Sequence, residues 1–442
     1  MSLSRDLLEK NLERVKYRLS LGAAVNDFDE YGYTPLIIAI MTEQVEAASY
    51  LLEHGADSNR ADLFGQPPLH WAIKVESVAL CELLLKRQAF PNTVSSYGEP
   101  LLVYPLLKKN QELINLLTRY GTDRTCAQDY IFKKYLGHHF SLSGYATFKN
   151  YNLLISLVDY QGFRLEFAIN QIARQFETYT SLYPDLIKNY KRIQDILYRA
   201  DRLRQLKKAI PSEQEAAFIN FISDINFLPL AFDGHAVSLV HTQRYAITCD
   251  RAQGRPATTT LYALSRPLSS SEISYLLYGK KDRRFWEKLP SHLNWNILAT
   301  IPIPTQIVGN CSWANLEPAP ILIDFLMNYE TTSMPTIPVH EIANAYNTWS
   351  EWSKNFLLQE ALIKSNELKD DRRTSLLLTL FDIFIQHPNT LPKWGELDAL
   401  LSKESNLFQA IGYQHQISKS QWWPKIAKWF DKNRWKAIDR LE

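Results

Sequence analysis

One cysteine of this chain stands where a thiol could be activated for chemistry. Cys311 lies between a short apolar run, residues 297–303, and an apolar stretch, residues 321–327, that predicts a helix. The N-terminus of a helix offers unpaired backbone N–H groups and a partial positive charge. Both favour the thiolate, which is the nucleophilic form of cysteine. Cys311 is therefore the predicted nucleophile.

A thiol nucleophile needs a base and a group that orients the base. Residues 234–240 predict a strand with His235 at its start, and residues 245–250 predict a second strand that ends at Asp250. A polar turn joins the two segments, so a hairpin would bring the imidazole and the carboxylate together. His235 is the predicted base and Asp250 the predicted orienting group.

Two further residues complete the candidate site or compete for a role in it. Gln306, five residues before Cys311, has a side-chain amide that could donate to an oxyanion. His241 shares strand parity with His235 and is a rival base, although it lies at the far end of the strand. A structural role for each residue alone stays open, since unpaired cysteines are often buried.

These blocks resemble the papain-like cysteine proteases in the wide sense. The similarity rests on Gly-Asn-Cys-Ser-Trp-Ala at 309–314 and Gly-His-Ala-Val-Ser-Leu-Val at 234–240. The chain order His, Asp, Gln, Cys is similar to the adenovirus protease group, which includes deubiquitinating and SUMO-specific proteases and bacterial acetyltransferase effectors. The resemblance covers 235–327 and implies an α+β domain. Trp313, two residues after the cysteine and not one, departs from papain.

The first quarter of the chain repeats with a period of 33 residues. Asparagines recur at 26, 59 and 92, and glycines at 32, 65 and 98. This spacing, with Thr-Pro-Leu and Leu-Leu blocks, resembles ankyrin repeats, an α-solenoid. The first unit is predicted to be truncated to one helix, residues 7–19. A later unit is predicted to be degenerate because it has Pro105 where the others carry alanine. About three to four units are expected.

Ankyrin arrays present hairpin tips and first-helix surfaces along a concave face to another protein. The aromatic, apolar and polar residues predicted at these tips are candidate partner contacts, or they pack on the next hairpin. They are Tyr31, Tyr33, Leu63, Phe64, Ser96 and Tyr97.

Composition excludes several classes of protein. The chain has 49 Lys and Arg against 47 Asp and Glu, so no bulk attraction to nucleic acid or membrane is expected. Four cysteines without paired spacing favour a reducing compartment. The polar N-terminus lacks a signal peptide, and no apolar run approaches the ~20 residues that span a bilayer. No phosphate loop, dinucleotide fingerprint or zinc-ligand spacing occurs, so neither cofactor nor metal is predicted.

Four regions are predicted in an α+β chain. They are the ankyrin repeats at 1–124, a junction and helical region at 125–232, a cysteine-protease-like core at 233–333, and a helical region at 334–442. The paired histidines at 138 and 139 are predicted to be structural, because no further ligands stand at metal spacing.

The whole combination resembles the ankyrin-repeat effectors that Legionella and its relatives inject by type IV secretion. The resemblance implies a monomer in the host cytoplasm, with the nucleus as a further compartment, that recruits a host protein through the ankyrin face. It also implies a Cys-His-Asp hydrolase that cleaves a peptide or isopeptide bond, or an acyltransferase with the same residues. A non-catalytic adaptor with a protease-like fold is the alternative, since fold alone does not decide function.

Overall fold

The chain forms two compact units in the computed structural model. One comprises residues 1–133 and 147–155, and the other residues 134–146 and 156–442. The structure describes residues 3–95, 98–140, 142, 145–148, 153–156, 165–205, 224–232, 235–251, 258–304, 311–332, 336–386 and 400.

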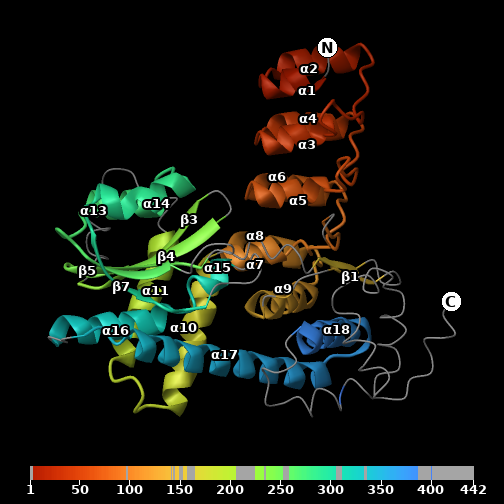
Figure 1. Cartoon of the computed structure of the whole chain (residues 1–442). Helices are drawn as coiled ribbons and strands as arrows, with labels where there is room; N and C mark the ends of the chain where they lie inside the picture. Colours follow the sequence, from red (N-terminus) through yellow and green to blue (C-terminus); the bar gives the residue numbers. More distant parts are fainter. Residues whose placement is uncertain are drawn as a thin grey trace, which may run out of the picture. The chain divides into compact units, whose positions relative to one another are not determined.

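Helix pairs stack in the first unit (Figure 1). In the described residues the pairs are α1 (Leu3–Leu8) with α2 (Leu12–Ser20), α3 (Pro35–Met41) with α4 (Val45–Glu53), α5 (Pro68–Lys74) with α6 (Val78–Lys86), and α7 (Val103–Lys108) with α8 (Gln111–Arg119). Each first helix packs on the next first helix, and α4, α6 and α8 pack likewise. The buried aliphatic side chains between them form one continuous core.

The repeated asparagines join each helix pair to the next. The side-chain amides of Asn26, Asn59 and Asn92 donate to backbone carbonyls 29 residues further on, at 2.9, 3.1 and 3.0 Å. Their side-chain oxygens accept backbone N–H groups 31 residues further on, each at 2.8 Å. The 33-residue period therefore reflects a series of hydrogen bonds in which each asparagine pairs with backbone N–H and C=O groups of the turn in the next repeat.

One expectation for this unit was wrong. The first repeat is not truncated, because Lys10 adopts a left-handed φ of 54° and ends α1, after which Asn11 caps α2. The repeat that contains Pro105 is a complete helix pair. Pro105 lies in the first turn of α7, where backbone N–H groups have no helical partner and proline is tolerated.

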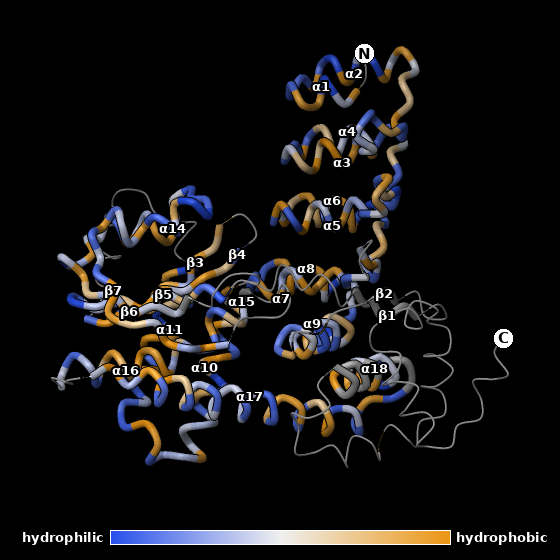
Figure 2. The backbone as a smooth tube through the Cα atoms, in the orientation of Figure 1, coloured by the Kyte–Doolittle hydropathy of each residue, from blue (hydrophilic) through white to orange (hydrophobic). Residues whose placement is uncertain are grey.

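A five-stranded antiparallel sheet lies in the described part of the second unit. Its order is β3 (Asn226–Phe232), β4 (His235–His241), β5 (Tyr245–Asp250), β6 (Thr258–Ala263) and β7 (Asn296–Ile301). Figure 2 shows β3 and β4 mainly in the colours of hydrophobic residues, as buried strands require. Strand β3 was not among the predicted strands. β1 (Tyr145–Phe148) and β2 (Leu153–Ser156) form a separate two-stranded sheet.

Helices cover both faces of this sheet (Figure 1). One face packs against α13 (Ser270–Tyr278) and α14 (Arg283–His292), while α15 (Cys311–Ala314) and α16 (Ala319–Thr331) pack against β4. The other described helices are α9 (Arg124–His139), α10 (Leu165–Leu182), α11 (Tyr190–Gln205), α17 (Val339–Glu367) and α18 (Asp370–Gln386). Apart from residue 400, the part of the predicted helical region that follows residue 390 lies outside the described residues.

In the part of the chain that the structure describes, no helix is both long enough and apolar enough to cross a bilayer.

Candidate active site

The β4–β5 hairpin places His235 next to Asp250. The two strands pair from His241 and Ala246 at the turn to Ser238 and Cys249, and then diverge. At this open end the Nε2 atom of His235 lies 2.9 Å from Oδ1 of Asp250. The two side chains keep only 18% and 12% of their surface exposed, so the hydrogen bond is largely sheltered from water.

The chemistry of this pair fixes the role of each imidazole nitrogen. A carboxylate only accepts hydrogen bonds, so Nε2 of His235 carries the proton that it shares with Asp250. In the neutral ring the basic lone pair is therefore on Nδ1. The ring also lies against Phe232, with 5.7 Å between ring centroids, which limits its rotation. An imidazole held in one tautomer and one orientation is suited to act as a general base.

Cys311 opens α15, which has four residues and packs beside β4. The sequence predicts this cysteine at the start of the long apolar helix, and that detail is wrong. A turn at 315–318 separates α15 from α16, which begins at Ala319. A single helical turn carries a smaller dipole than a long helix, so the N–H groups at its start are what could favour a thiolate. Gln306 lies outside the described residues.

Asn315, directly after α15, bridges the diverging strands. Its side-chain amide donates to the carbonyl of Ala236 at 2.6 Å, and its side-chain oxygen accepts the N–H of Arg251 at 2.7 Å. Its own carbonyl accepts the hydroxyl of Ser238 at 2.5 Å. Ala236 follows His235 and Arg251 follows Asp250, so one buried carboxamide ties the end of α15 to the neighbours of both residues.

A buried network of charged and polar groups joins Arg251 to the C-terminal end of α15 and to α17. The Nη1 atom of Arg251 donates to the carbonyl of Ala314 at 2.7 Å and to the hydroxyl of Tyr346 at 2.8 Å. That hydroxyl donates to Oε2 of Glu317 at 2.7 Å, and the guanidinium lies 3.8 Å from the same carboxylate oxygen. Ser350 donates to the other oxygen at 3.0 Å. Helix α17 is thereby fastened to the segment from Ala314 to Glu317, at the C-terminal end of α15.

Glu317 stays ionised inside this network. Burial would raise the pKa of its carboxyl, but neighbouring charges and the Tyr346 hydroxyl lower it below the ordinary value. Burial lowers the pKa of His139 to about 3, so that imidazole is neutral at pH 7. The cations that stabilise the carboxylate are therefore Arg251 and Lys354.

Trp313 anchors α15 in the interior of the unit. Its indole is 2% exposed and lies 4.4 Å from the His139 ring and 5.3 Å from the Tyr135 ring, between centroids. The tryptophan two residues after the cysteine is thus a packing anchor for the helix.

The other histidine and cysteine of the hairpin have surroundings unsuited to catalysis. Burial lowers the pKa of His241 to about 4, and this residue lies beside the turn, at the opposite end of β4 from His235. Burial raises the pKa of the Cys249 thiol to about 11, and that thiol accepts a hydrogen bond from Thr259 at 3.6 Å. A thiol with so high a pKa is not a nucleophile at neutral pH.

The predicted partner residues lie on the first unit. Tyr31, Leu63 and Phe64 are 64%, 66% and 64% exposed, and Tyr33 is half-buried. Ser96 and Tyr97 lie outside the described residues. Leu63 also packs on the preceding hairpin, where its N–H donates to the carbonyl of Gly32 at 2.9 Å.

Sequence reasoning missed Arg251, Asn315, Glu317 and Tyr346. A signal for two of them exists, because Asn315 and Glu317 interrupt the otherwise apolar residues 313–323. A polar residue in such a run either lies in a turn or has a buried side chain that forms hydrogen bonds. Within the described residues, no three His, Cys, Asp or Glu side chains lie together so that they could hold a metal ion.

Comparisons with known proteins assign the first unit. A family model described as ankyrin repeats (3 copies) matches residues 7–62, and a single ankyrin-repeat model matches residues 64–96. The first unit is an ankyrin array.

Curated protein sequences contain no match to this chain. Among solved structures, the chain is similar to the "Structure of Legionella Effector AnkH", with a TM-score of 0.67 and 26% identity. The similarity covers 98% of this chain and 97% of that one, so it includes the second unit as well as the ankyrin array.

Proposed function

We propose that this protein is a Legionella-type effector that acts inside a host cell. In this proposal the ankyrin array binds a host protein, and a thiol site in the second unit cleaves a peptide or isopeptide bond. The similarity to the Legionella effector AnkH, over almost the full length of both chains, supports the first part. Delivery by type IV secretion into the host cytoplasm, with access to the nucleus, belongs to the same proposal.

The hydrogen bond between His235 and Asp250 is the observation that carries the thiol site. It joins an imidazole and a carboxylate at the open end of β4 and β5, where Asn315 also fastens the end of the Cys311 helix. A general base with its orienting group accounts for both groups.

The reaction proceeds in two steps. Deprotonated by His235, the Cys311 sulfur attacks the carbonyl carbon and forms a C–S bond, while the Cys311 N–H and the Gln306 amide stabilise the oxyanion. The C–N bond then breaks, and the His235 imidazolium protonates the leaving nitrogen. In the second step His235 takes a proton from water, the hydroxide attacks the thioester, and the thiolate leaves. An amine in place of water would give acyl transfer.

Acetylation by p-nitrophenyl acetate tests the thiol site. The Cys311 sulfur would take the acetyl group and release p-nitrophenolate, and water would then hydrolyse the thioester. Mass spectrometry of the full chain should find a transient acetyl group on Cys311, with continued release of p-nitrophenolate. His235→Ala should abolish both, whereas His292→Ala, an exposed histidine of α14, should leave both intact.

Acetyl groups found only on Cys126, the exposed cysteine of α9, or equally on Cys311 in the His235→Ala variant, would refute the thiol site.

A second candidate is a non-catalytic adaptor in which the second unit is a binding surface. The pocket of the ankyrin array, whose lining residues all belong to the first unit, agrees with an adaptor, because binding there needs no thiol. If Cys311→Ser keeps every effect of the protein in host cells while Phe64→Ala abolishes binding to its partner, the adaptor replaces the hydrolase.

A further inference from the structure

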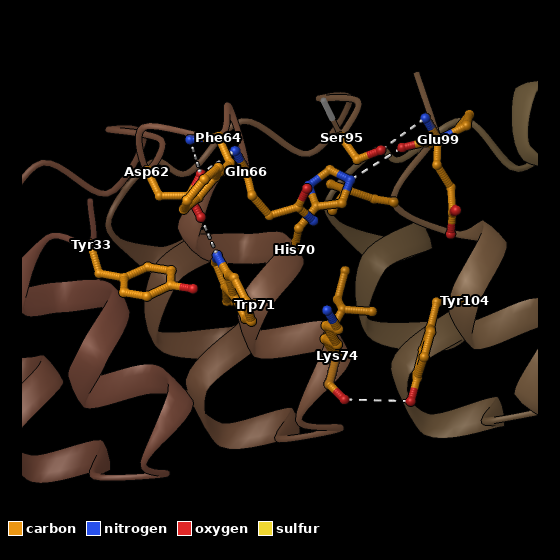
Figure 3. Close-up of a pocket in the computed structure, with 13 residues that line it drawn as sticks. Tyr33, Asp62, Phe64, Gln66, His70, Trp71, Lys74, Ser95, Glu99 and Tyr104 are labelled. Carbon is orange, nitrogen blue, oxygen red and sulfur yellow. Dashed lines mark hydrogen bonds between the residues drawn. The ribbon is translucent and has the colours of Figure 1, made fainter. Parts of the chain in front are cut away.

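A pocket of about 420 Å³ opens on the surface that the ankyrin hairpins and first helices share. Figure 3 shows aromatic side chains and a lysine in a row on the helices, below loops that carry two carboxylates. The residues on which its chemistry depends are Tyr33, Asp62, Trp71, Lys74, Glu99 and Tyr104. Of the residues that line the pocket, Tyr33 and Phe64 belong to the contacts predicted from the hairpin tips.

The indole of Trp71 is fixed in the wall of this pocket. Its Nε1 atom donates to Oδ2 of Asp62 at 3.0 Å, and Oδ1 of Asp62 accepts the N–H groups of Phe64 and Gln66 at 2.9 and 2.8 Å. The ring of Tyr33 meets the indole edge-on, with 5.8 Å between centroids. A side chain held this way loses little conformational freedom when a ligand stacks on it.

A cation already lies on the indole face. The ammonium group of Lys74 is 4.7 Å from the centroid of the Trp71 ring, the distance of a cation–π contact. Lys74 is an exposed side chain, so it can leave this position at small cost. The contact shows that the ring face is accessible to a positive charge.

Carboxylates outnumber cations in the lining of the pocket. Asp62 and Glu99 are its carboxylates and Lys74 its cation. Burial lowers the pKa of His70 to about 4, which outweighs its hydrogen bond to the Glu99 carbonyl, so this imidazole adds no charge at pH 7. In Figure 3 the Glu99 side chain extends from its loop toward the helices, on the side where Lys74 and Tyr104 lie.

We propose that this pocket binds the guanidinium group of an arginine in an extended segment of a partner protein. The guanidinium plane stacks on Trp71 in place of the Lys74 ammonium, and Glu99 supplies the countercharge. Arginine fits better than lysine because its flat, weakly hydrated cation stacks on aromatic faces and donates in a fork to carboxylates. An acidic anchor would meet two carboxylates, and an apolar anchor would strip water from them without compensation.

This inference rests on the proposed role of the ankyrin array in recruiting a protein and is independent of the thiol site. The probes are immobilised nine-residue peptides of glycine, serine and alanine that differ only at the central position, which is arginine, lysine, glutamate or leucine. The full chain should bind the arginine peptide at least about fivefold more tightly than the leucine peptide, and the glutamate peptide least.

Two variants should change this binding in opposite directions. Trp71→Leu should weaken binding of the arginine peptide about tenfold, as expected for a stacking anchor. Lys74→Ala should strengthen it about threefold, since it removes a competing cation whose field is partly screened by salt. The matched controls are Phe90→Ala, an aromatic 61% exposed outside the pocket, and Lys86→Ala, an exposed lysine of α6, and neither should alter binding.

Weaker binding of the arginine peptide by Lys74→Ala, preference for the glutamate or leucine peptide, or equal binding of all four would overturn the proposal. Because Lys74 is exposed, its variant tests the pocket even if Trp71→Leu fails to fold. Acetylation of Cys311 by p-nitrophenyl acetate, measured in the same samples, reports on the thiol site separately. If the full chain is acetylated on Cys311 but shows no preference for the arginine peptide, the arginine pocket is contradicted and the thiol site is not.

Discussion

The side-chain oxygen of Asn315 accepts the backbone N–H of Arg251 at 2.7 Å, between two strands that have stopped pairing with each other. Its amide nitrogen meets the Ala236 carbonyl of the other strand at 2.6 Å. The carboxamide takes the place of the missing ladder hydrogen bonds and comes from the segment that directly follows the Cys311 helix. One residue thus fixes the spacing of β4, β5 and α15 around His235 and Asp250.

Replacing Asn315 by leucine should destabilise the second unit strongly. Leucine fills a similar volume but removes both side-chain hydrogen bonds and leaves the Arg251 N–H buried without its acceptor, which costs about 3 kcal/mol. Urea unfolding should show this loss, and hydrogen exchange at the Arg251 amide should accelerate. Asn328→Leu, on the exposed face of α16, is the control and should change stability by at most about 0.5 kcal/mol. Equal effects of the two variants would contradict the bridging role.

Arg251 and Glu317 should be energetically coupled. Either Arg251→Met or Glu317→Leu leaves a charge buried without its partner, and each should cost about 3–5 kcal/mol. The double variant removes both charges, so it should be more stable than the sum of the two losses predicts, by about 1–3 kcal/mol. A double-mutant cycle measured by urea unfolding gives this coupling energy, and additive losses would show that the network does not act as a unit.

The parts of this fold that depend on local spacing could be predicted from the sequence. The 33-residue period identifies the ankyrin array because each turn asparagine must reach the next repeat. Short, mainly apolar runs predict β4 and β5, and the polar turn between them predicts their hairpin. Contacts between distant segments carry no such period. Asn315, Glu317 and Tyr346 meet Arg251 only after the sheet and α17 have packed, so their role could not be predicted from spacing.

The second unit should lose stability as the pH falls below about 6.5. Burial lowers the pKa of His138 and His139 to about 3 and that of His241 to about 4, from an ordinary value of 6.5. As the pH falls, the unfolded chain therefore takes up protons before the folded chain does. The stabilisation is complete above pH 6.5. Between that pH and the folded-state pKa values it declines by about 1.4 kcal/mol per pH unit for each histidine.

Unfolding in urea between pH 6.5 and 5 measures this slope. His241→Leu should reduce it by one histidine's share, while His292→Leu, at an exposed position, should leave it unchanged. A slope that is the same in all three proteins would contradict this, because it would mean that His241 binds its proton equally well in the folded and unfolded chains.

Two glycines of the ankyrin array should respond differently to alanine. Gly32 and Gly55 both have left-handed φ angles, 85° and 90°, so alanine costs each about 1–2 kcal/mol of backbone strain. At Gly32 the new Cβ would also lie 2.9 Å from Cβ of Leu63, whereas at Gly55 it would meet nothing within 4 Å. Gly32→Ala should therefore lower the melting temperature more than Gly55→Ala does. The reverse order would mean that the hairpins are not packed as described.

The rate at which iodoacetamide alkylates Cys311 as a function of pH tests the thiol site most directly. The exposed Cys126 serves as an internal standard, while Cys81 and Cys249 should stay unlabelled because burial raises their pKa values to about 12 and about 11.

If His235 activates Cys311, this thiol should react at least about tenfold faster than Cys126 at pH 6, and His235→Ala should remove the advantage. If Cys311 instead gains reactivity with pH in parallel with Cys126, and His235→Ala changes nothing, the catalytic account is contradicted.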